Sequence, residues 1–203
     1  MSRTVFPGTS MPDPDWWRAL WPEPEKVLAR LDISPTAHVV DLCCGDGLFT
    51  VPLAHMARRV TAIDLDAEMV ERTRARLSAS GTTNCTLIAG DAYALAELVA
   101  EPADVVLIAN TFHGVPDKAR LARAVAATLN AGGRFIVINW HRRPREQTTV
   151  LGEPRGPKTE TRMAPEEVAA TVSQAGLRPL DVIDLPPYHY AAISRKRPEA
   201  DPA

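Results

Sequence analysis

Short apolar runs alternate with segments of helical period along most of the chain. Five of these runs have the length of buried strands: residues 38–42, 59–63, 85–89, 104–109 and 134–139. Four segments between or after them have helical period: residues 48–58, 67–79, 117–130 and 164–175. Such alternation predicts a parallel sheet with helices on both faces.

Two further apolar runs, residues 178–184 and 188–194, end this pattern. The link through Pro186 and Pro187 is too short for a parallel crossover, so the pair is expected to be antiparallel. Alternation along the last run would place Tyr188 and Tyr190 on the same face of the sheet. The whole pattern predicts an α/β fold with a seven-stranded, mostly parallel, doubly wound sheet and an antiparallel C-terminal hairpin.

The length of 203 residues suits one domain with a complete core. We expect a single domain over residues 31–197, preceded by an aromatic segment over residues 1–30 and followed by a disordered tail over residues 198–203. Trp16 and Trp17 in the first segment predict a lid or substrate wall, or alternatively an amphipathic helix docked on the core.

Composition limits the possible partners. A net charge of -2 gives no electrostatic case for nucleic acid or an anionic membrane, and no apolar stretch reaches spanning length. Three cysteines, two of them adjacent, make a poor disulfide framework, and no CxxC or HExxH spacing predicts a metal site. We therefore expect a cytoplasmic protein, monomer or homodimer, that acts on a small molecule.

Residues 39–50 (VVDLCCGDGLFT) carry the strongest chemical signal. An apolar strand leads into an acid, a glycine turn and a helix, which presents backbone N–H groups to a bound nucleoside. Polar or aromatic residues follow each later strand of the predicted sheet: Asp64, Asp91, Asn110, His113, Trp140 and His141. Because ligands of such sheets bind at the carboxyl ends of the strands, these residues are expected to share one site.

From residue 38 to residue 195 the chain resembles the class I S-adenosylmethionine-dependent methyltransferases. Its acid and glycines match the first motif of that family, and the segment from residue 112 to 140 is similar to its small-molecule, type 11 branch. The resemblance implies S-adenosyl-L-methionine as the cofactor, with S-adenosyl-L-homocysteine as the product. It implies a cofactor-binding set of Asp41, Cys43, Gly45, Gly47, Asp64, Leu65, Asp91, Ala92 and Asn110.

Two positions in the glycine turn leave alternatives open. Cys43 stands where the family usually has a glycine, and its side chain either packs the turn or has a chemical role. Asp46 precedes the predicted helix, where capping is a commoner role than contact with a cofactor.

Methyl transfer from a sulfonium mainly requires alignment. If the acceptor must lose a proton, His113 is the first candidate base and His141 the second, and either could instead only line the rim. Asn110 could begin a (D/N)PPY motif, but Thr111, Phe112 and His113 do not continue it, and no cysteine follows Cys85. Both observations favour a small-molecule acceptor over nucleic acid.

The expected substrate pocket consists of Trp16, Trp17, Trp140 and Tyr188. The segment from residue 140 to 163 is predicted to be a loop whose basic residues attract an anionic substrate or are simply solvated. Two other functions stay open at this point. One is a non-catalytic module that binds S-adenosylmethionine to support a partner, and the other is an NAD(P)-dependent reductase.

Overall fold

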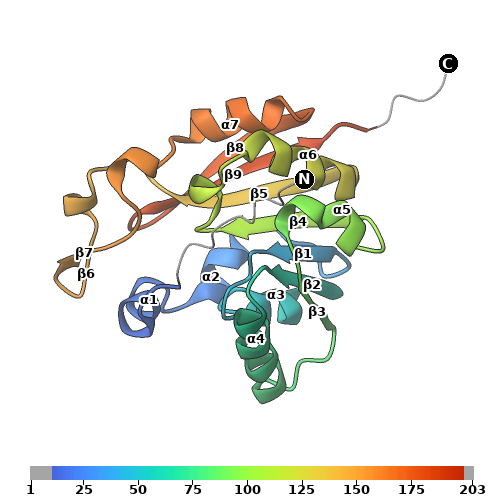
Figure 1. Cartoon of the computed structure of the whole chain (residues 1–203), viewed down its shortest axis with the longest axis horizontal. Coiled ribbons are helices and arrows are strands. Elements are labelled where there is room, and N and C mark those ends of the chain that lie inside the picture. Colours follow the sequence, from blue (N-terminus) through green and yellow to red (C-terminus); the bar gives the residue numbers. More distant parts are fainter. Residues whose placement is uncertain (1–10, 199–203) are drawn as a thin grey trace, which may run out of the picture.

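The computed structural model describes residues 11–198, and a seven-stranded sheet forms its centre (Figure 1). The strands lie in the order β3-β2-β1-β4-β5-β9-β8. Neighbours from β3 to β5 pair in parallel, and β9 is antiparallel to both β5 and β8. Their bounds are β1 His38–Leu42, β2 Arg59–Asp64, β3 Cys85–Ala89, β4 Ala103–Ala109, β5 Leu129–Trp140, β8 Leu177–Leu185 and β9 His189–Lys196. The predicted fold class and the C-terminal hairpin are confirmed.

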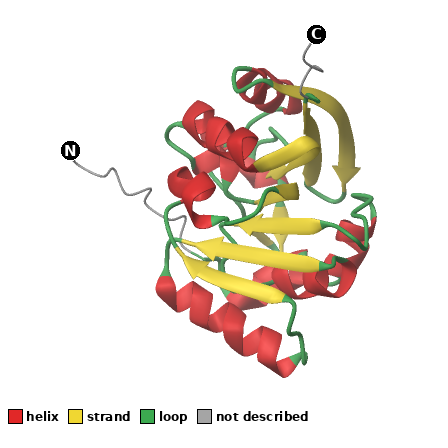
Figure 2. Cartoon of the chain, turned by 90° about the vertical axis from the view of Figure 1, so that its right-hand side faces the viewer, coloured by secondary structure: helices red, strands yellow, loops and turns green. Residues whose placement is uncertain are grey.

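Helices cover both faces of this sheet (Figure 2). On one face lie α1 Pro14–Leu20, α2 Pro24–Ala29, α3 Thr50–Met56 and α4 Ala67–Ala79, and on the other lie α5 Leu95–Leu98, α6 Lys118–Thr128 and α7 Pro165–Ser173. Successive residues of a strand point to opposite faces, so Val39 belongs to the first apolar cluster and Val40 to the second.

Element ends differ from the prediction where the chain turns. The predicted helix over residues 48–58 begins only at Thr50, because the glycine turn extends that far. The helix predicted to end at residue 130 ends at Thr128, since β5 starts at Leu129 and pairs there with Ala103. Asp117 caps this helix by accepting a hydrogen bond from the backbone N–H of Arg120 at 2.8 Å, as its position predicts.

The shared face predicted for Tyr188 and Tyr190 is wrong. Tyr188 precedes β9, which begins at His189, so strand alternation does not apply to it. It packs against the cluster that contains Trp140, whereas Tyr190 lies in the cluster on the opposite face.

The segment between β5 and α7 folds into short elements rather than an open loop. They are two 3₁₀ turns, η3 Arg145–Gln147 and η4 Thr159–Thr161, and a two-stranded ribbon of β6 Thr149–Val150 and β7 Glu153–Pro154. Two further 3₁₀ turns, η1 Ala92–Ala94 and η2 Phe112–Gly114, follow β3 and β4. The second of them carries His113 to the edge of the sheet.

The aromatic N-terminal segment packs on the core through α1. Asp13 caps this helix by accepting a hydrogen bond from the backbone N–H of Asp15 at 3.0 Å. Trp17 and Trp21 are buried in the first apolar cluster. Residues 1–10 of the predicted segment and 199–203 of the predicted tail lie outside the described residues. Across residues 11–198, no helix has the length and apolar character needed to cross a membrane.

Candidate active site

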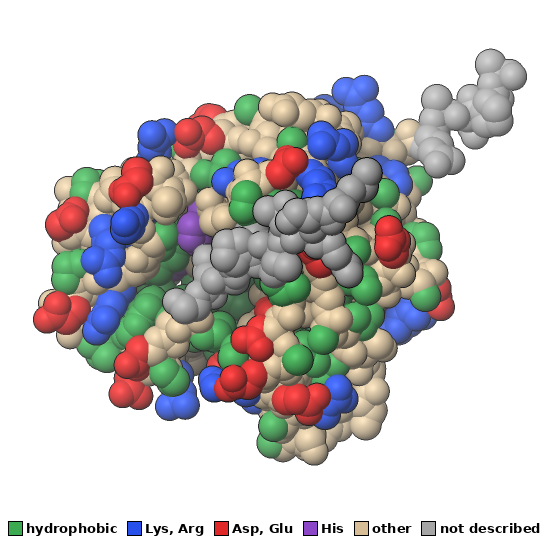
Figure 3. Space-filling view, in the orientation of Figure 1, with side chains coloured by type: hydrophobic (Ala, Val, Ile, Leu, Met, Phe, Trp, Pro, Cys, Tyr) green, Lys and Arg blue, Asp and Glu red, His purple; other side chains and the backbone are tan. Residues whose placement is uncertain are grey.

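A cleft of about 650 Å³ opens at the carboxyl ends of β1 and β4, where the strand order reverses. Figure 3 shows a hollow in this region, with hydrophobic side chains in its wall. Eight of the predicted site residues line the cleft: Trp16, Trp17, Asp41, Cys43, Gly45, Asn110, His113 and Trp140.

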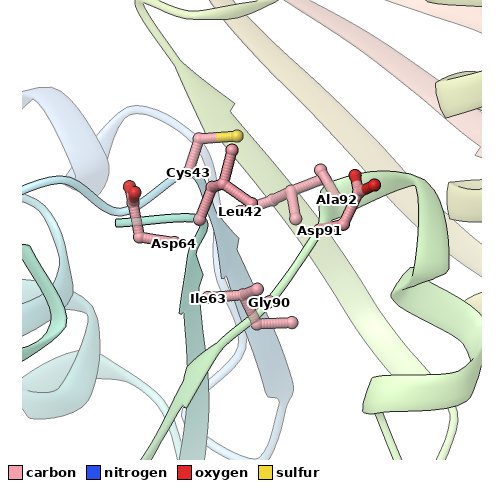
Figure 4. Close-up of a pocket in the computed structure, with 8 residues that line it drawn as sticks. Leu42, Cys43, Ile63, Asp64, Gly90, Asp91 and Ala92 are labelled. Carbon is pink, nitrogen blue, oxygen red and sulfur yellow. The ribbon is translucent and has the colours of Figure 1, made fainter. Parts of the chain in front are cut away.

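A smaller depression lies beside the cleft at the ends of β2 and β3 (Figure 4). Four predicted cofactor residues line it: Asp64, Leu65, Asp91 and Ala92. Cys43 borders both the depression and the cleft. The carboxylates of Asp64 and Asp91 lie on opposite sides of Cys43 (Figure 4). The structure therefore brings two acids, the glycine turn and His113 to one edge of the sheet.

The two glycines of the turn adopt left-handed backbone conformations, with φ of +56° at Gly45 and +85° at Gly47. A Cβ at Gly47 would lie 2.9 Å from Thr73 Oγ1 of α4, and a Cβ at Gly45 would lie 2.8 Å from Met11 Sδ. The turn is thus held between α4 and the N-terminal segment, and at Gly47 the close approach of Thr73 leaves no room for a side chain.

Cys43 also has a left-handed conformation, with φ of +60°. Burial raises the pKa of its thiol, and the nearby Asp64 and Asp41 carboxylates raise the pKa further. Burial raises the pKa of the neighbouring Cys44 thiol in the same way. Both thiols are consequently protonated at neutral pH, which favours packing of the turn over a nucleophilic role.

The acids at the ends of β2 and β3 accept hydrogen bonds from backbone N–H groups. Asp64 accepts from the backbone N–H of Gly45 at 2.8 Å and from that of Asp66 at 3.0 Å. Asp91 accepts from the backbone N–H of Tyr93 at 2.9 Å and so caps η1. A carboxylate oxygen has two lone pairs, so each acid retains acceptor capacity for ribose or adenine groups.

Asp41 lies at the end of β1 and is almost fully buried. Its carboxyl group accepts a hydrogen bond from Thr50 Oγ1 at 2.6 Å. Burial raises its pKa to about 7, although the bond from Thr50 opposes the rise. A carboxyl group that is partly protonated at neutral pH therefore lies at the base of the cleft.

Asn110 and Asp46 complete this side of the cleft. Asn110 has φ of +59°, and its side-chain nitrogen and oxygen are both buried without a hydrogen-bond partner in the part of the chain that the structure describes. Such an amide is suited to bind a polar ligand. Asp46 does not cap α3, whose first turn receives no side-chain hydrogen bond; it forms an ion pair with Arg76 of α4 instead.

The two candidate bases lie in different surroundings. His113 lines the cleft, and its Nδ1 lies 3.1 Å from Asn139 Oδ1 of β5. Burial lowers the pKa of His113. His141 does not line the cleft; its Nε2 lies 2.7 Å from Asp184 Oδ1 of β8.

Trp140 forms one wall of the cleft and Tyr188 supports it. Their rings are stacked, with centroids 6.0 Å apart and an angle of 10° between their planes. The hydroxyl group of Tyr188 donates to the carbonyl of Thr149 at 2.8 Å, and Tyr188 does not line the cleft. A Cβ at Gly156 would lie 2.9 Å from three atoms of the Trp140 ring, so this glycine packs closely against the ring.

Some residues of the cleft carry no signal in the sequence. Met11 and Phe49 line it, and so does Gly156. Apolar residues and single glycines of this kind occur throughout any chain, so only the folded arrangement distinguishes them.

Similarity to a curated relative decides the family. The ubiquinone biosynthesis O-methyltransferase of Xanthomonas axonopodis pv. citri is 31% identical in an alignment that covers 82% of this chain and 77% of that protein. The chain belongs to the class I S-adenosylmethionine-dependent methyltransferases. A family profile described as a methyltransferase domain matches residues 39–133 of this methyltransferase.

Structural similarity supports the same fold. A crystal structure of a SAM-dependent methyltransferase from Aquifex aeolicus superposes with a TM-score of 0.76 at 22% identity, over 90% of this chain and 93% of that chain.

A 23S rRNA (uracil(1939)-C(5))-methyltransferase of Xanthomonas campestris pv. campestris is 42% identical over 64 residues, which cover 32% of this chain and 14% of that protein. The similarity to that RNA enzyme is thus confined to a short segment.

S-adenosylmethionine is the cofactor of this methyltransferase, and the observed groups fit it. The cleft has unpartnered amide atoms at Asn110, a buried acid at Asp41 and a turn without side chains at Gly45. These groups are suited to an amino acid moiety, while the acids of the adjoining depression are suited to the hydroxyl and amino groups of adenosine.

Proposed function

We propose that this methyltransferase transfers a methyl group to a hydroxyl oxygen of a small molecule and that His113 accepts the hydroxyl proton. The single observation that carries the proposal is the position of His113, which lies in the wall of the cleft with one ring nitrogen bound by Asn139.

The contact with Asn139 supports Nε2 as the basic nitrogen of His113. With Asn139 Oδ1 facing the ring, His113 Nδ1 donates to this oxygen and Nε2 keeps its lone pair. Burial lowers the pKa of His113, so the ring is neutral at pH 7 and able to accept a proton. The bound cofactor supplies an activated methyl group, and the residues of the cleft align the acceptor with it.

Two further observations support a small hydroxyl-bearing acceptor. The relative from Xanthomonas axonopodis pv. citri, which matches most of the chain, is named as an O-methyltransferase of ubiquinone biosynthesis. The net charge of -2 and the lack of a (D/N)PPY motif after β4 give no support to a nucleic-acid acceptor. All three cysteines are free, which agrees with the cytoplasmic location that we propose.

The test measures transfer of methyl groups to a panel of phenols and hydroxylated rings, with the methylated atom identified by mass spectrometry and NMR. We expect O-methyl products. For an accepted phenol, His113→Gln should lower kcat by about 10²- to 10⁴-fold and leave the affinity for S-adenosylhomocysteine unchanged. His141→Gln is the matched control, because its side chain bonds Asp184 outside the cleft.

The pH dependence gives a second readout. The wild-type kcat should fall as pH decreases through the lowered pKa of His113, below 6.5, and should reach a plateau above it. If His113→Gln keeps both the rate and this pH profile, His113 is not the base. Methylation only at nitrogen, sulfur or carbon would contradict the proposed acceptor.

A further inference from the structure

One wall of the cleft is basic and has no compensating acid. Arg145, Arg155 and Lys158 from the segment between β5 and α7 all line it. None of the three takes part in an ion pair with another residue in the range 11–198. The Nε group of Arg155 is buried and has no hydrogen-bond partner among the described residues.

The other cations of this segment have different surroundings. Arg142 pairs with Glu167 at 2.9 Å. Arg162 is only 2% exposed and donates to the backbone carbonyls of Pro157 and Arg143 at 3.1 and 3.0 Å. The predicted alternative of a simply solvated loop is thus wrong for Arg162. Arg162 stabilises the conformation of the segment that brings Arg145, Arg155 and Lys158 to the cleft.

Acids do not neutralise the basic wall. Glu146, Glu153 and Glu160 of the same segment are exposed and do not line the cleft. Asp46, on the opposite side, pairs with Arg76. Asp41 is buried and accepts its hydrogen bond from α3. An anionic ligand group would therefore find unpaired cations here.

The walls beside these cations are aromatic. The ring of Trp140 borders the cleft, and the guanidinium of Arg155 lies 5.6 Å from the centre of the Trp16 ring. Flat apolar surfaces of this kind suit a ring-bearing ligand. We propose that the acceptor is a ring-bearing carboxylic acid whose carboxylate is bound by Arg155 and Lys158. This inference rests on the proposed function, since it names the substrate class of the same site.

The methionyl carboxylate of the cofactor has the same chemistry, so the two sources must be separated. The glycine turn and the predicted cofactor acids lie at the ends of β1, β2 and β3. Arg155 and Lys158 instead belong to the segment that follows β5 and line the cleft together with Trp140 and His113. This placement favours the acceptor as the source of the carboxylate.

Calorimetry tests the inference without turnover. The protein saturated with S-adenosylhomocysteine is titrated with 4-hydroxybenzoate, 3-hydroxybenzoate and 4-hydroxyphenylacetate and with the methyl ester of each. We expect at least one acid to bind about tenfold or more tightly than its ester, because each charge-assisted hydrogen bond to the carboxylate is lost in the ester. High salt should reduce this preference, since the cations are partly exposed.

The double variant Arg155→Gln with Lys158→Gln should abolish the preference for the acid. Arg143→Gln is the matched control, because it removes an exposed charge from the same segment and its side chain does not line the cleft.

The inference is overturned if every ester binds as well as its acid or if no acid binds. It is also overturned if the double variant lowers the affinity for S-adenosylhomocysteine by about tenfold or more, because the cations then bind the cofactor. Binding of an acid without methyl transfer would contradict the proposed function and the role of that acid as acceptor, whereas the carboxylate-binding role of Arg155 and Lys158 would stand.

Discussion

Replacing Asp41 with asparagine should stabilise the protein at neutral pH and weaken binding of the cofactor. Burial raises the pKa of Asp41 from 3.8 to about 7. A rise of this size corresponds to a penalty on the order of 4 kcal/mol for the ionised form in the folded state. The amide cannot ionise, so this penalty is absent in Asp41→Asn.

The sign of the pH dependence follows from proton release. Between pH 4 and 7 the unfolded chain ionises at Asp41 while the folded protein keeps the proton, so the wild type loses stability as pH rises through this window. The amide of asparagine adds a buried donor, which costs about 1–3 kcal/mol. The variant should therefore be less stable than the wild type near pH 4 and more stable by about 1–3 kcal/mol at pH 8.

Urea unfolding of the ligand-free protein, followed by the fluorescence of its four tryptophans, measures this difference across the pH range. Asp15→Asn is the control, since it removes an exposed carboxylate. At pH 8, where Asp41 is mostly ionised, the affinity of Asp41→Asn for S-adenosylhomocysteine should be about tenfold lower than that of the wild type, because a charged acceptor is lost from the cleft. A difference in stability between variant and wild type that stays constant from pH 4 to 8 would refute the reasoning.

Three more predictions concern the cleft. Asp64→Ala should weaken S-adenosylhomocysteine binding by about one to two orders of magnitude in calorimetry, and an unchanged affinity would remove Asp64 from the cofactor site. Gly156→Ala should lower the free energy of unfolding by about 1–3 kcal/mol more than Gly152→Ala, because both positions have positive φ but only the first would bring a Cβ to 2.9 Å from the Trp140 ring. Cys43→Gly should keep turnover within about threefold, since glycine adopts a φ of +60° freely, whereas a much larger loss of turnover would assign the thiol a chemical role.

The sheet and one half of the cleft could be predicted because their signals are local. Each strand is a short apolar run, and the acid or glycine that follows it stands at a fixed place in the sequence. Asp64 and Asp91 therefore reach the same edge of the sheet as Gly45, as topology requires. Helical period predicts that α6 ends at residue 130, but it ends at Thr128, because Leu129 pairs with Ala103 in a tertiary contact that helical period does not reveal.

The other half of the cleft could not be predicted in the same way. Its wall is formed by α1 and by the segment between β5 and α7, which are distant in the chain and meet only in the folded protein. The sequence shows that this segment is basic, but it does not show which cations are buried. His141 follows β5 directly and is still turned to Asp184 of β8, which local pattern does not reveal.

Arg155 and Arg162 show why residue type alone is insufficient here. Both belong to one short segment, and both guanidinium groups lie near a tryptophan ring. Arg162 makes hydrogen bonds to four oxygen atoms of its own segment, so its charge is already satisfied and its function is to hold the fold. The guanidinium of Arg155 has no such acceptors within the described part of the chain, and it borders the cleft. The difference between a structural and a ligand-binding arginine therefore lies in the acceptors that surround each side chain, and those acceptors are fixed by the fold of the segment.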